Sequence, residues 1–142
     1  MIVLAYDHRG YKLACDIKKY LEKNKIQYIE FASKKYTATD SYSEFANLAC
    51  KYILEHNDAK GIFICGTGIG ISMAGNRHKG IRAGLCHDAE TTRLARNDDD
   101  INVLVLAGNT CGKTKATKLI NIFLNTPFEG GRHIARLEML DK

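Results

Sequence analysis

Short apolar runs alternate with longer stretches along this chain, and the alternation predicts its secondary structure. The runs have the length of buried β-strands. They are Ile2–Tyr6, Ile26–Phe31, Gly61–Ile64, Arg82–Leu85 and Asn102–Leu106. Strands that alternate with helices along a chain form parallel sheets covered by helices on both faces. We therefore expect an α/β fold with a five-stranded parallel sheet.

Between the strands, apolar residues recur at the spacing of an amphipathic helix. The predicted apolar faces are Leu13, Ile17 and Leu21 in the first helix, Phe45, Leu48, Ala49, Tyr52 and Ile53 in the second, and Ala116, Leu119, Ile120, Phe123 and Leu124 after the fifth strand. Ser41 and Glu44 have the spacing of a capping box at the start of the second helix. We therefore assign both to helix capping.

The whole chain, residues 1–142, is expected to be one domain. Its length suits a single hydrophobic core. Apolar residues make up 45% and charged residues 26%, which is typical of a globular protein. A polar loop at Ala32–Asp40 is the one irregular segment inside it. Beyond Pro127, a tail at 127–142 carries a predicted short helix, Arg132–Leu140.

Composition favours a small anionic ligand over nucleic acid or a membrane. The net charge is +5, but there is no block of lysines and arginines, and only 8% of residues are aromatic. The apolar start ends at Asp7-His8-Arg9, so it is too short for a signal peptide or a membrane span. Five cysteines without a CxxC pair indicate neither a zinc site nor disulfides. We expect a cytoplasmic protein that binds no metal.

Ligands of open parallel sheets bind beyond the carboxyl ends of the strands. Three segments stand there in this sequence: Asp7-His8 after the first strand, Cys65-Gly66-Thr67 after the third and Cys86-His87-Asp88 after the fourth. Asp7 and His8 could be an acid and a donor at the mouth of a site. They could equally be a polar turn.

The most informative stretch is Cys65-Gly66-Thr67-Gly68-Ile69-Gly70-Ile71-Ser72. Its three glycines, between a strand and a helix, allow backbone N–H groups to converge on an anionic oxygen. A dinucleotide is an alternative ligand, with Asp88 near the place of a ribose-binding acid. However, the dinucleotide fingerprint requires glycine where Ile71 stands, and it usually follows the first strand.

Cys65 gives this loop a chemical function. A thiol beside a helix N-terminus and converging amides favours the thiolate near neutral pH. The alternative is that Cys65 is a small buried apolar residue, as we expect of the other four cysteines. The glycine loop favours the functional interpretation for Cys65.

Arg132 and Arg136 offer a second anion-binding group. Four residues apart on a helix, they lie on one face. Paired guanidinium groups suit a phosphate monoester, which arginine binds through parallel hydrogen bonds. From spacing alone, a solvated basic face is the alternative.

Together these motifs resemble the ribose-5-phosphate isomerase B family, which also includes the subunits of galactose-6-phosphate isomerase. The resemblance covers essentially the whole chain. Its most specific parts are the glycine loop and the Glu129-Gly130-Gly131-Arg132-His133 run. The others are Ala5-Tyr6-Asp7-His8 with Gly10, Asn76, Gly80-Ile81-Arg82-Ala83, Asn102-Val103-Leu104 and Arg136.

The resemblance implies a Rossmann-like three-layer α/β/α sandwich and an aldose–ketose isomerase that needs no cofactor. It implies a homodimer, or a dimer of dimers, with active sites between subunits and the tail at 127–142 packed on a partner. The reaction it implies belongs to carbohydrate metabolism, in the pentose phosphate pathway, and proceeds through a cis-enediol.

The resemblance also assigns roles to individual residues. Cys65 matches the base that moves the proton between C1 and C2, and Thr67 matches the residue that shuttles a proton among the sugar oxygens. The amides of Gly66, Gly68 and Gly70 would stabilise the enediolate. The remaining matches are His8, Arg132 and Arg136 for the phosphate, Asp7 for the sugar hydroxyls, and Tyr42, Ser72, Asn76 and Asp99 among the substrate-binding residues.

Two departures from the family pattern concern the sugar end of the site. Asp98 and Asp99 stand where most members have a histidine, which opens the sugar ring, and an asparagine. Ser41-Tyr42-Ser43 replaces a typical Asp-Tyr-Pro segment. Asp98 is the candidate for ring opening, although a carboxylate is a poor proton donor at neutral pH. Ribose 5-phosphate is the expected substrate. The alternatives are galactose 6-phosphate or another hexose 6-phosphate, a subunit of such an isomerase, or a non-catalytic sugar-phosphate-binding relative.

Overall fold

Five parallel strands form one sheet in the computed structural model, which describes residues 1–142. The strands are β1 (Ile2–Tyr6), β2 (Tyr28–Phe31), β3 (Lys60–Cys65), β4 (Ala83–Leu85) and β5 (Val103–Ala107). Their order across the sheet is β2-β1-β3-β5-β4. All five predicted strands are present, with ends that differ from the prediction by two residues at most.

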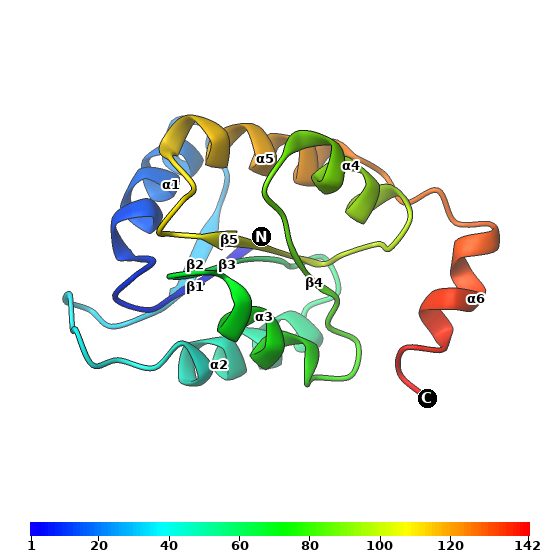
Figure 1. Ribbon diagram of the computed structural model, residues 1–142, viewed down its shortest axis with the longest axis horizontal. Helices are drawn as coiled ribbons and strands as arrows, with labels where there is room; N and C mark the ends of the chain where they lie inside the picture. Colours follow the sequence, from blue (N-terminus) through cyan, green and yellow to red (C-terminus); the bar gives the residue numbers. More distant parts are fainter.

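Six helices cover the sheet and extend beyond it. They are α1 (Tyr11–Lys23), α2 (Tyr42–Glu55), α3 (Ile69–Asn76), α4 (Ala89–Asn97), α5 (Lys113–Asn125) and α6 (Arg132–Glu138). Figure 1 shows α1, α4 and α5 on one face of the sheet and α2 and α3 on the other. The expected three-layer α/β/α sandwich is therefore confirmed. None of the helices combines the length and apolar character needed to span a bilayer.

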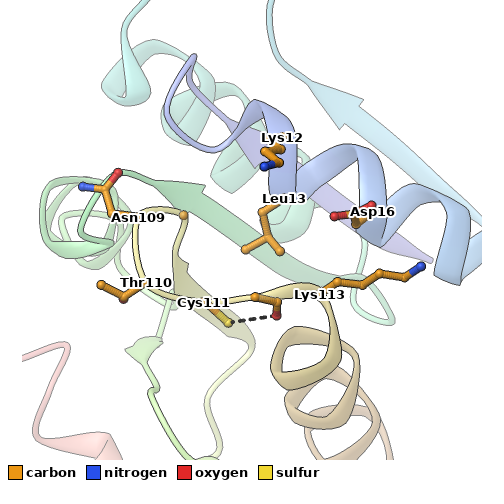
Figure 2. A pocket seen from close by; sticks show the side chains of 9 residues that line it. Lys12, Leu13, Asp16, Asn109, Thr110, Cys111 and Lys113 are labelled. Atoms are coloured by element: carbon orange, nitrogen blue, oxygen red, sulfur yellow. Dashed lines mark hydrogen bonds between the residues drawn. The ribbon is translucent and has the colours of Figure 1, made fainter.

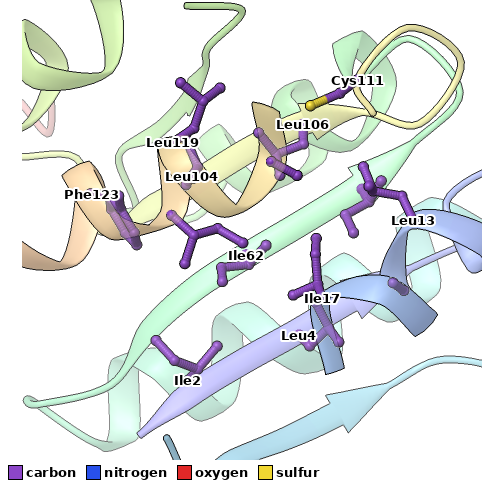
Figure 3. Close-up of a cluster of buried hydrophobic side chains, with 14 of the residues drawn as sticks. Ile2, Leu4, Leu13, Ile17, Ile62, Leu104, Leu106, Cys111, Leu119 and Phe123 are labelled. Atoms are coloured by element: carbon purple, nitrogen blue, oxygen red, sulfur yellow. The ribbon is translucent and has the colours of Figure 1, made fainter. Parts of the chain in front are cut away.

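Each face of the sheet carries its own apolar core. The larger cluster, of 18 buried residues, lies between β1, β3 and β5 and the helices α1 and α5 (Figure 3). The other, of 14 buried residues, lies under α2 and α3. Fully burying one leucine, isoleucine or phenylalanine contributes about 1.5–3 kcal/mol. These two clusters hold the central strands rigid, and the functional loops extend from the ends of those strands.

Two expectations for α2 are corrected by the structure. Leu48 was expected in the core but is 48% exposed. The buried stripe instead includes Ala46 and Cys50, whose small side chains let the helix approach the sheet closely. The second correction concerns capping: Ser41 is the N-cap residue, but its side chain makes no capping hydrogen bond.

The C-terminal helix α6 stands apart from the sheet. Figure 1 shows it beyond the end of α4, on the opposite side of the molecule from the loop between β1 and α1. Several contacts hold the tail there, and two of them are hydrogen bonds donated by backbone N–H groups. The N–H of Glu129 donates to the carbonyl of Asn97 (2.9 Å), and the N–H of Gly80 donates to the carboxylate of Asp141 (3.1 Å).

Candidate active site

A pocket of about 520 Å³ opens at the carboxyl ends of β1 and β3. Two of the three segments singled out at strand ends meet there. The third contributes no lining residue, and Asp88 in it caps α4 by accepting the N–H of Thr91 (2.8 Å). The lining residues are Asp7, His8, Arg9, Asp40, Tyr42, Cys65, Gly66, Thr67, Ile69 and Gly70.

The loop between β1 and α1 is fixed by its own acid. Asp7 is buried, and its Oδ1 accepts the N–H of Arg9 (3.0 Å) and the N–H of Gly10 (3.2 Å). Gly10 is required by close packing, because a Cβ atom there would stand 2.6 Å from the carbonyl oxygen of Ile64. The β1–α1 loop is therefore pressed against β3, beside Cys65.

His8 is oriented by Asp40, from the irregular loop before α2. Oδ1 of Asp40 lies 2.8 Å from the backbone nitrogen of His8 and 2.8 Å from its Nδ1. The other carboxylate oxygen accepts the hydroxyl of Ser33 (3.0 Å). With Nδ1 engaged, Nε2 is the ring nitrogen left to meet a ligand.

The glycine loop supplies free backbone donors. Gly68 has φ 78°, in the left-handed region that favours glycine, and it starts the turn into α3. The N–H groups of Gly66, Thr67, Gly68 and Gly70 have no acceptor within the chain. They stand at a helix N-terminus, where the helix dipole also favours negative charge. This segment can therefore bind an anionic oxygen.

Cys65 closes β3 and forms part of the pocket wall. It is only 4% exposed and belongs to the apolar cluster under α2 and α3, but it is also among the residues that line the pocket. Burial raises the pKa of Cys50 to about 12 and also raises the pKa of Cys86 and of Cys111. Those three sulfurs are therefore protonated thiols at neutral pH. Of the buried cysteines, only Cys65 reaches the pocket.

Thr67 and Tyr42 complete the wall around the loop. The Oγ1 of Thr67 accepts the N–H of Ile69 (3.2 Å), and its hydroxyl proton is free to donate. The ring of Tyr42 packs on Gly70, where an added Cβ atom would stand 2.6 Å from Cζ of the tyrosine. Gly70 thus makes room for the Tyr42 ring at the pocket wall.

The other candidate residues lie outside this pocket. Ser72 and Asn76 line a shallow depression on the outer side of α3. The amide of Asn76 is committed to the edge of β4, where it pairs with the N–H and C=O of Ala83 (2.8 and 2.9 Å). Its predicted contact with substrate gains no support from this geometry.

The remaining candidates lie away from the pocket, on the side of the molecule that carries the end of α4 and α6 (Figure 1). They are Asp98 and Asp99, where α4 ends, and Arg132 and Arg136, on α6. Both arginines are exposed, on the helix that stands apart from the sheet. One chain therefore does not bring the arginine pair to Cys65. The predicted grouping of these arginines with Cys65 therefore needs a second subunit, which is the arrangement that the family resemblance implies.

His133 anchors the helix that carries the arginines. It is buried, and its Nε2 lies 3.0 Å from Oε2 of Glu129 and 3.7 Å from Oδ1 of Asp98. Asp98 also accepts a hydrogen bond from the amide of Asn97 (2.7 Å). Three potential metal-ligand atoms, one each from Asp98, Glu129 and His133, lie within 4.8 Å of one another. The hydrogen bond between His133 and Glu129 accounts for this spacing without an ion.

A second pocket, of about 440 Å³, lies beside the first, between α1 and the loop from β5 to α5 (Figure 2). Its wall includes Lys12 and Asp16 of α1 and Asn109 and Thr110 of the loop. The loop is joined to the glycine loop by two hydrogen bonds, from the N–H of Gly108 to the carbonyl of Cys65 (2.8 Å) and from that of Asn109 to Gly66 (2.9 Å).

Sequence reasoning missed three residues that line the first pocket: Arg9, Asp40 and Ile69. Arg9 directly follows Asp7 and His8, so its position in the sequence indicated that it could lie at the same site. Asp40 carried no local signal, because it meets His8 from 32 positions away. Ile69 lies inside the glycine loop, but an apolar residue there does not indicate a site.

Fold and pocket together define a parallel α/β protein with a thiol beside an anion-binding loop. A family model described as ribose/galactose isomerase matches residues 2–140. The chain belongs to the ribose/galactose isomerase family, as the motifs predicted.

Individual relatives agree over nearly the whole chain. A probable ribose-5-phosphate isomerase B of Mycoplasma pneumoniae is 39% identical over 136 residues, covering 96% of this chain and 90% of the relative. Ribose-5-phosphate isomerase B of Escherichia coli is 32% identical over 139 residues, covering 98% and 93%.

Solved structures confirm the fold. The crystal structure of a ribose 5-phosphate isomerase from Thermotoga maritima superposes with a TM-score of 0.94 at 38% identity, covering 99% of this chain and 96% of that one. Ribose-5-phosphate isomerase B of Mycoplasma genitalium, with bound ribulose 5-phosphate, gives 0.93 at 35% identity, covering 98% and 92%. The protein is therefore an isomerase of this fold family.

Proposed function

We propose that this protein interconverts ribose 5-phosphate and ribulose 5-phosphate at the pocket around Cys65, without a metal or an organic cofactor. The observation that carries the proposal is one arrangement: a cysteine in the pocket wall beside four backbone N–H groups that have no acceptor. Relatives named as ribose-5-phosphate isomerases, one of them a structure with bound ribulose 5-phosphate, support the choice of substrate.

The reaction requires a base and a set of donors. The thiolate of Cys65 takes the proton from C2 of the open-chain aldose and returns it to C1, so that an enediolate lies between substrate and product. Thr67 moves a proton between the two sugar oxygens. The free N–H groups of the glycine loop stabilise the charge that develops on oxygen. One such donor contributes about 3 kcal/mol to transition-state stabilisation, so the loop is the main electrostatic contributor.

The phosphate end of the substrate would be bound by two subunits. His8 belongs to the same chain as Cys65, while Arg132 and Arg136 would come from a second copy, because α6 points away from the pocket of its own chain. Exposed apolar residues support self-association: Ile69 and Met73 of α3 are each 55% exposed, and Leu48 of α2 is 48% exposed.

The assembly we propose is a homodimer, or a dimer of two dimers, of single-domain subunits. In it the tail at 127–142 packs on the partner. Five unpaired cysteines suit a reducing compartment, and we place the enzyme in the cytoplasm, in the pentose phosphate pathway.

Ring opening is assigned to Asp98, with Asp99 beside it. Asp98 ends α4 next to the anchor of α6, so the partner that supplies the arginines would also supply this carboxylate. An ionised carboxylate can accept the proton of the ring hydroxyl. Donation of a proton to the ring oxygen would need a protonated carboxyl group, so we expect Asp98 to open the ring more slowly than a histidine would.

A hexose 6-phosphate, galactose 6-phosphate in particular, is the second candidate substrate. The observation that favours it is the pair Asp98-Asp99 in place of histidine and asparagine, with the changed segment around Tyr42. Both changes lie at the sugar end of the proposed site and leave its phosphate end intact.

A substrate panel separates these candidates. The purified protein is incubated with ribose 5-phosphate, allose 6-phosphate and galactose 6-phosphate, and ketose formation is followed. We expect the highest kcat/KM with ribose 5-phosphate. Turnover of hexose 6-phosphates but not of ribose 5-phosphate would show that the substrate is a hexose 6-phosphate. Binding of sugar phosphates without any turnover would point to a non-catalytic relative, and stabilisation by a dinucleotide alone would point to nucleotide binding.

A further inference from the structure

Arg9 stands at the rim of the pocket, and no role has yet been assigned to it. It follows His8 in the loop between β1 and α1 and lines the pocket together with Cys65 and Gly66. It is the only lysine or arginine among the lining residues. Its side chain is exposed and forms no ion pair within the chain.

The aliphatic part of Arg9 lies across the glycine loop. A Cβ atom placed on Gly66 would stand 2.7 Å from Cδ of Arg9 and 3.4 Å from its Nη1. The glycine therefore leaves room for the arginine to lie flat on the loop. On the other side, the amide nitrogen of Asn109 stands 3.2 Å from the same Cβ position and carries no charge.

The acids of the pocket do not neutralise this guanidinium. Asp7 accepts two backbone N–H groups of its own loop. Asp40 is bonded to His8 and Ser33. A cation that lies next to a row of free N–H groups and forms no ion pair with a carboxylate of its own chain can bind an anionic ligand. A guanidinium matches a phosphate group because it can donate two parallel hydrogen bonds.

We propose that Arg9 is a further substrate-contacting residue, which binds the phosphate group from the same subunit as Cys65. This rests on the proposed function and extends it. The phosphate subsite then has a half within one chain, His8 and Arg9, which faces the arginines of the second copy. His8 and Arg9 already line the pocket in a single chain, without the partner's residues.

Three variants test the assignment. Arg9→Met keeps an unbranched stem over Gly66 but removes the charge and the donors. Arg9→Lys keeps the charge but not the forked donors. Lys19→Met, on the exposed side of α1 with no bonded partner, removes one positive charge as the matched control. For each purified oligomer, kcat and KM for ribose 5-phosphate are measured, and inorganic phosphate is titrated by calorimetry.

For Arg9→Met we expect KM and the Kd for inorganic phosphate to rise together by about 10- to 100-fold, with a smaller change in kcat. Arg9→Lys should recover part of this loss, and Lys19→Met should match the wild type. Unchanged KM and unchanged phosphate affinity in Arg9→Met would overturn the assignment. A fall in kcat alone would overturn it too, because it would place Arg9 at the enediolate.

Failure of the proposed function has a different signature. In that case the wild type would not isomerise any sugar phosphate, while Arg9→Met would still weaken the binding of inorganic phosphate. If the proposed function holds but Arg9 does not bind phosphate, the wild type isomerises ribose 5-phosphate, and Arg9→Met binds inorganic phosphate as tightly as the wild type does.

Discussion

Cys65→Ala is expected to lower kcat for ribose 5-phosphate by at least about 10³-fold. A positioned base contributes about 10²- to 10⁴-fold, and this reaction needs the same group both to take and to return the proton. None of the other buried cysteines reaches the pocket, and burial raises the pKa of Cys50, Cys86 and Cys111, so none of these can replace Cys65. The measurement is ketose formation under saturating substrate.

The fold should tolerate this change. Cys65 lies at the end of β3 in the wall of a pocket, so removing its sulfur enlarges the pocket instead of opening a closed cavity. We expect a loss of about 1 kcal/mol or less in the free energy of unfolding. Cys15→Ala, at a half-buried position of α1 outside the pocket, is the matched control and should keep full activity. Full activity in Cys65→Ala would contradict the mechanism.

The second large effect is expected from the double variant Arg132→Ala/Arg136→Ala. Each hydrogen-bonded contact to a charged phosphate contributes about 1.5–3 kcal/mol, so kcat/KM should fall by about 10²- to 10⁴-fold. Most of the loss should appear in KM, because the phosphate contacts are made in the ground state and the transition state alike. Steady-state kinetics over a wide range of ribose 5-phosphate concentrations measures both constants.

Lys118→Ala, on the exposed side of α5, is the control for this variant, since it removes a surface cation that has no bonded partner. Its KM should equal that of the wild type. If the double arginine variant also kept the wild-type KM, then Arg132 and Arg136 would be only a solvated face of α6.

The sheet and its functional loops could be predicted from sequence because both follow from local pattern. Apolar runs set the strands, and in a parallel sheet the carboxyl ends of neighbouring strands lie together. This rule brings the loop after β1 to the glycine loop after β3, as the pairing of Tyr6 with Ile64 shows. The prediction needed no knowledge of individual contacts.

What the sequence did not reveal depends on contacts between distant residues. Asp40 orients His8 across 32 positions, and the loop that carries it has no regular pattern. Arg9 follows Asp7 and His8 in the sequence, but only the structure shows that its side chain lies on the glycine loop without an ion pair. Leu48 fits the periodic stripe of α2, but smaller neighbours allow the helix to turn a different face to the sheet.

The place of α6 could not be read from one chain at all. A helix with two arginines on one face gives no indication of which surface it serves. The structure shows that α6 does not reach the pocket of its own chain. The proposed mechanism therefore needs a site shared by two subunits, each of which supplies one half.

Co-expression of two impaired variants tests this claim most directly. One chain carries Cys65→Ala and the other Arg132→Ala/Arg136→Ala, each with a different affinity tag, and the mixed dimer is purified over both. Activity is measured at a ribose 5-phosphate concentration near the wild-type KM, where both parent variants are nearly inactive. If the halves come from different subunits, one of the two sites is intact and the mixed dimer should have about half of the wild-type activity. A purified mixed dimer as inactive as its parents would contradict the shared site, because each chain would then need its own cysteine and its own arginines.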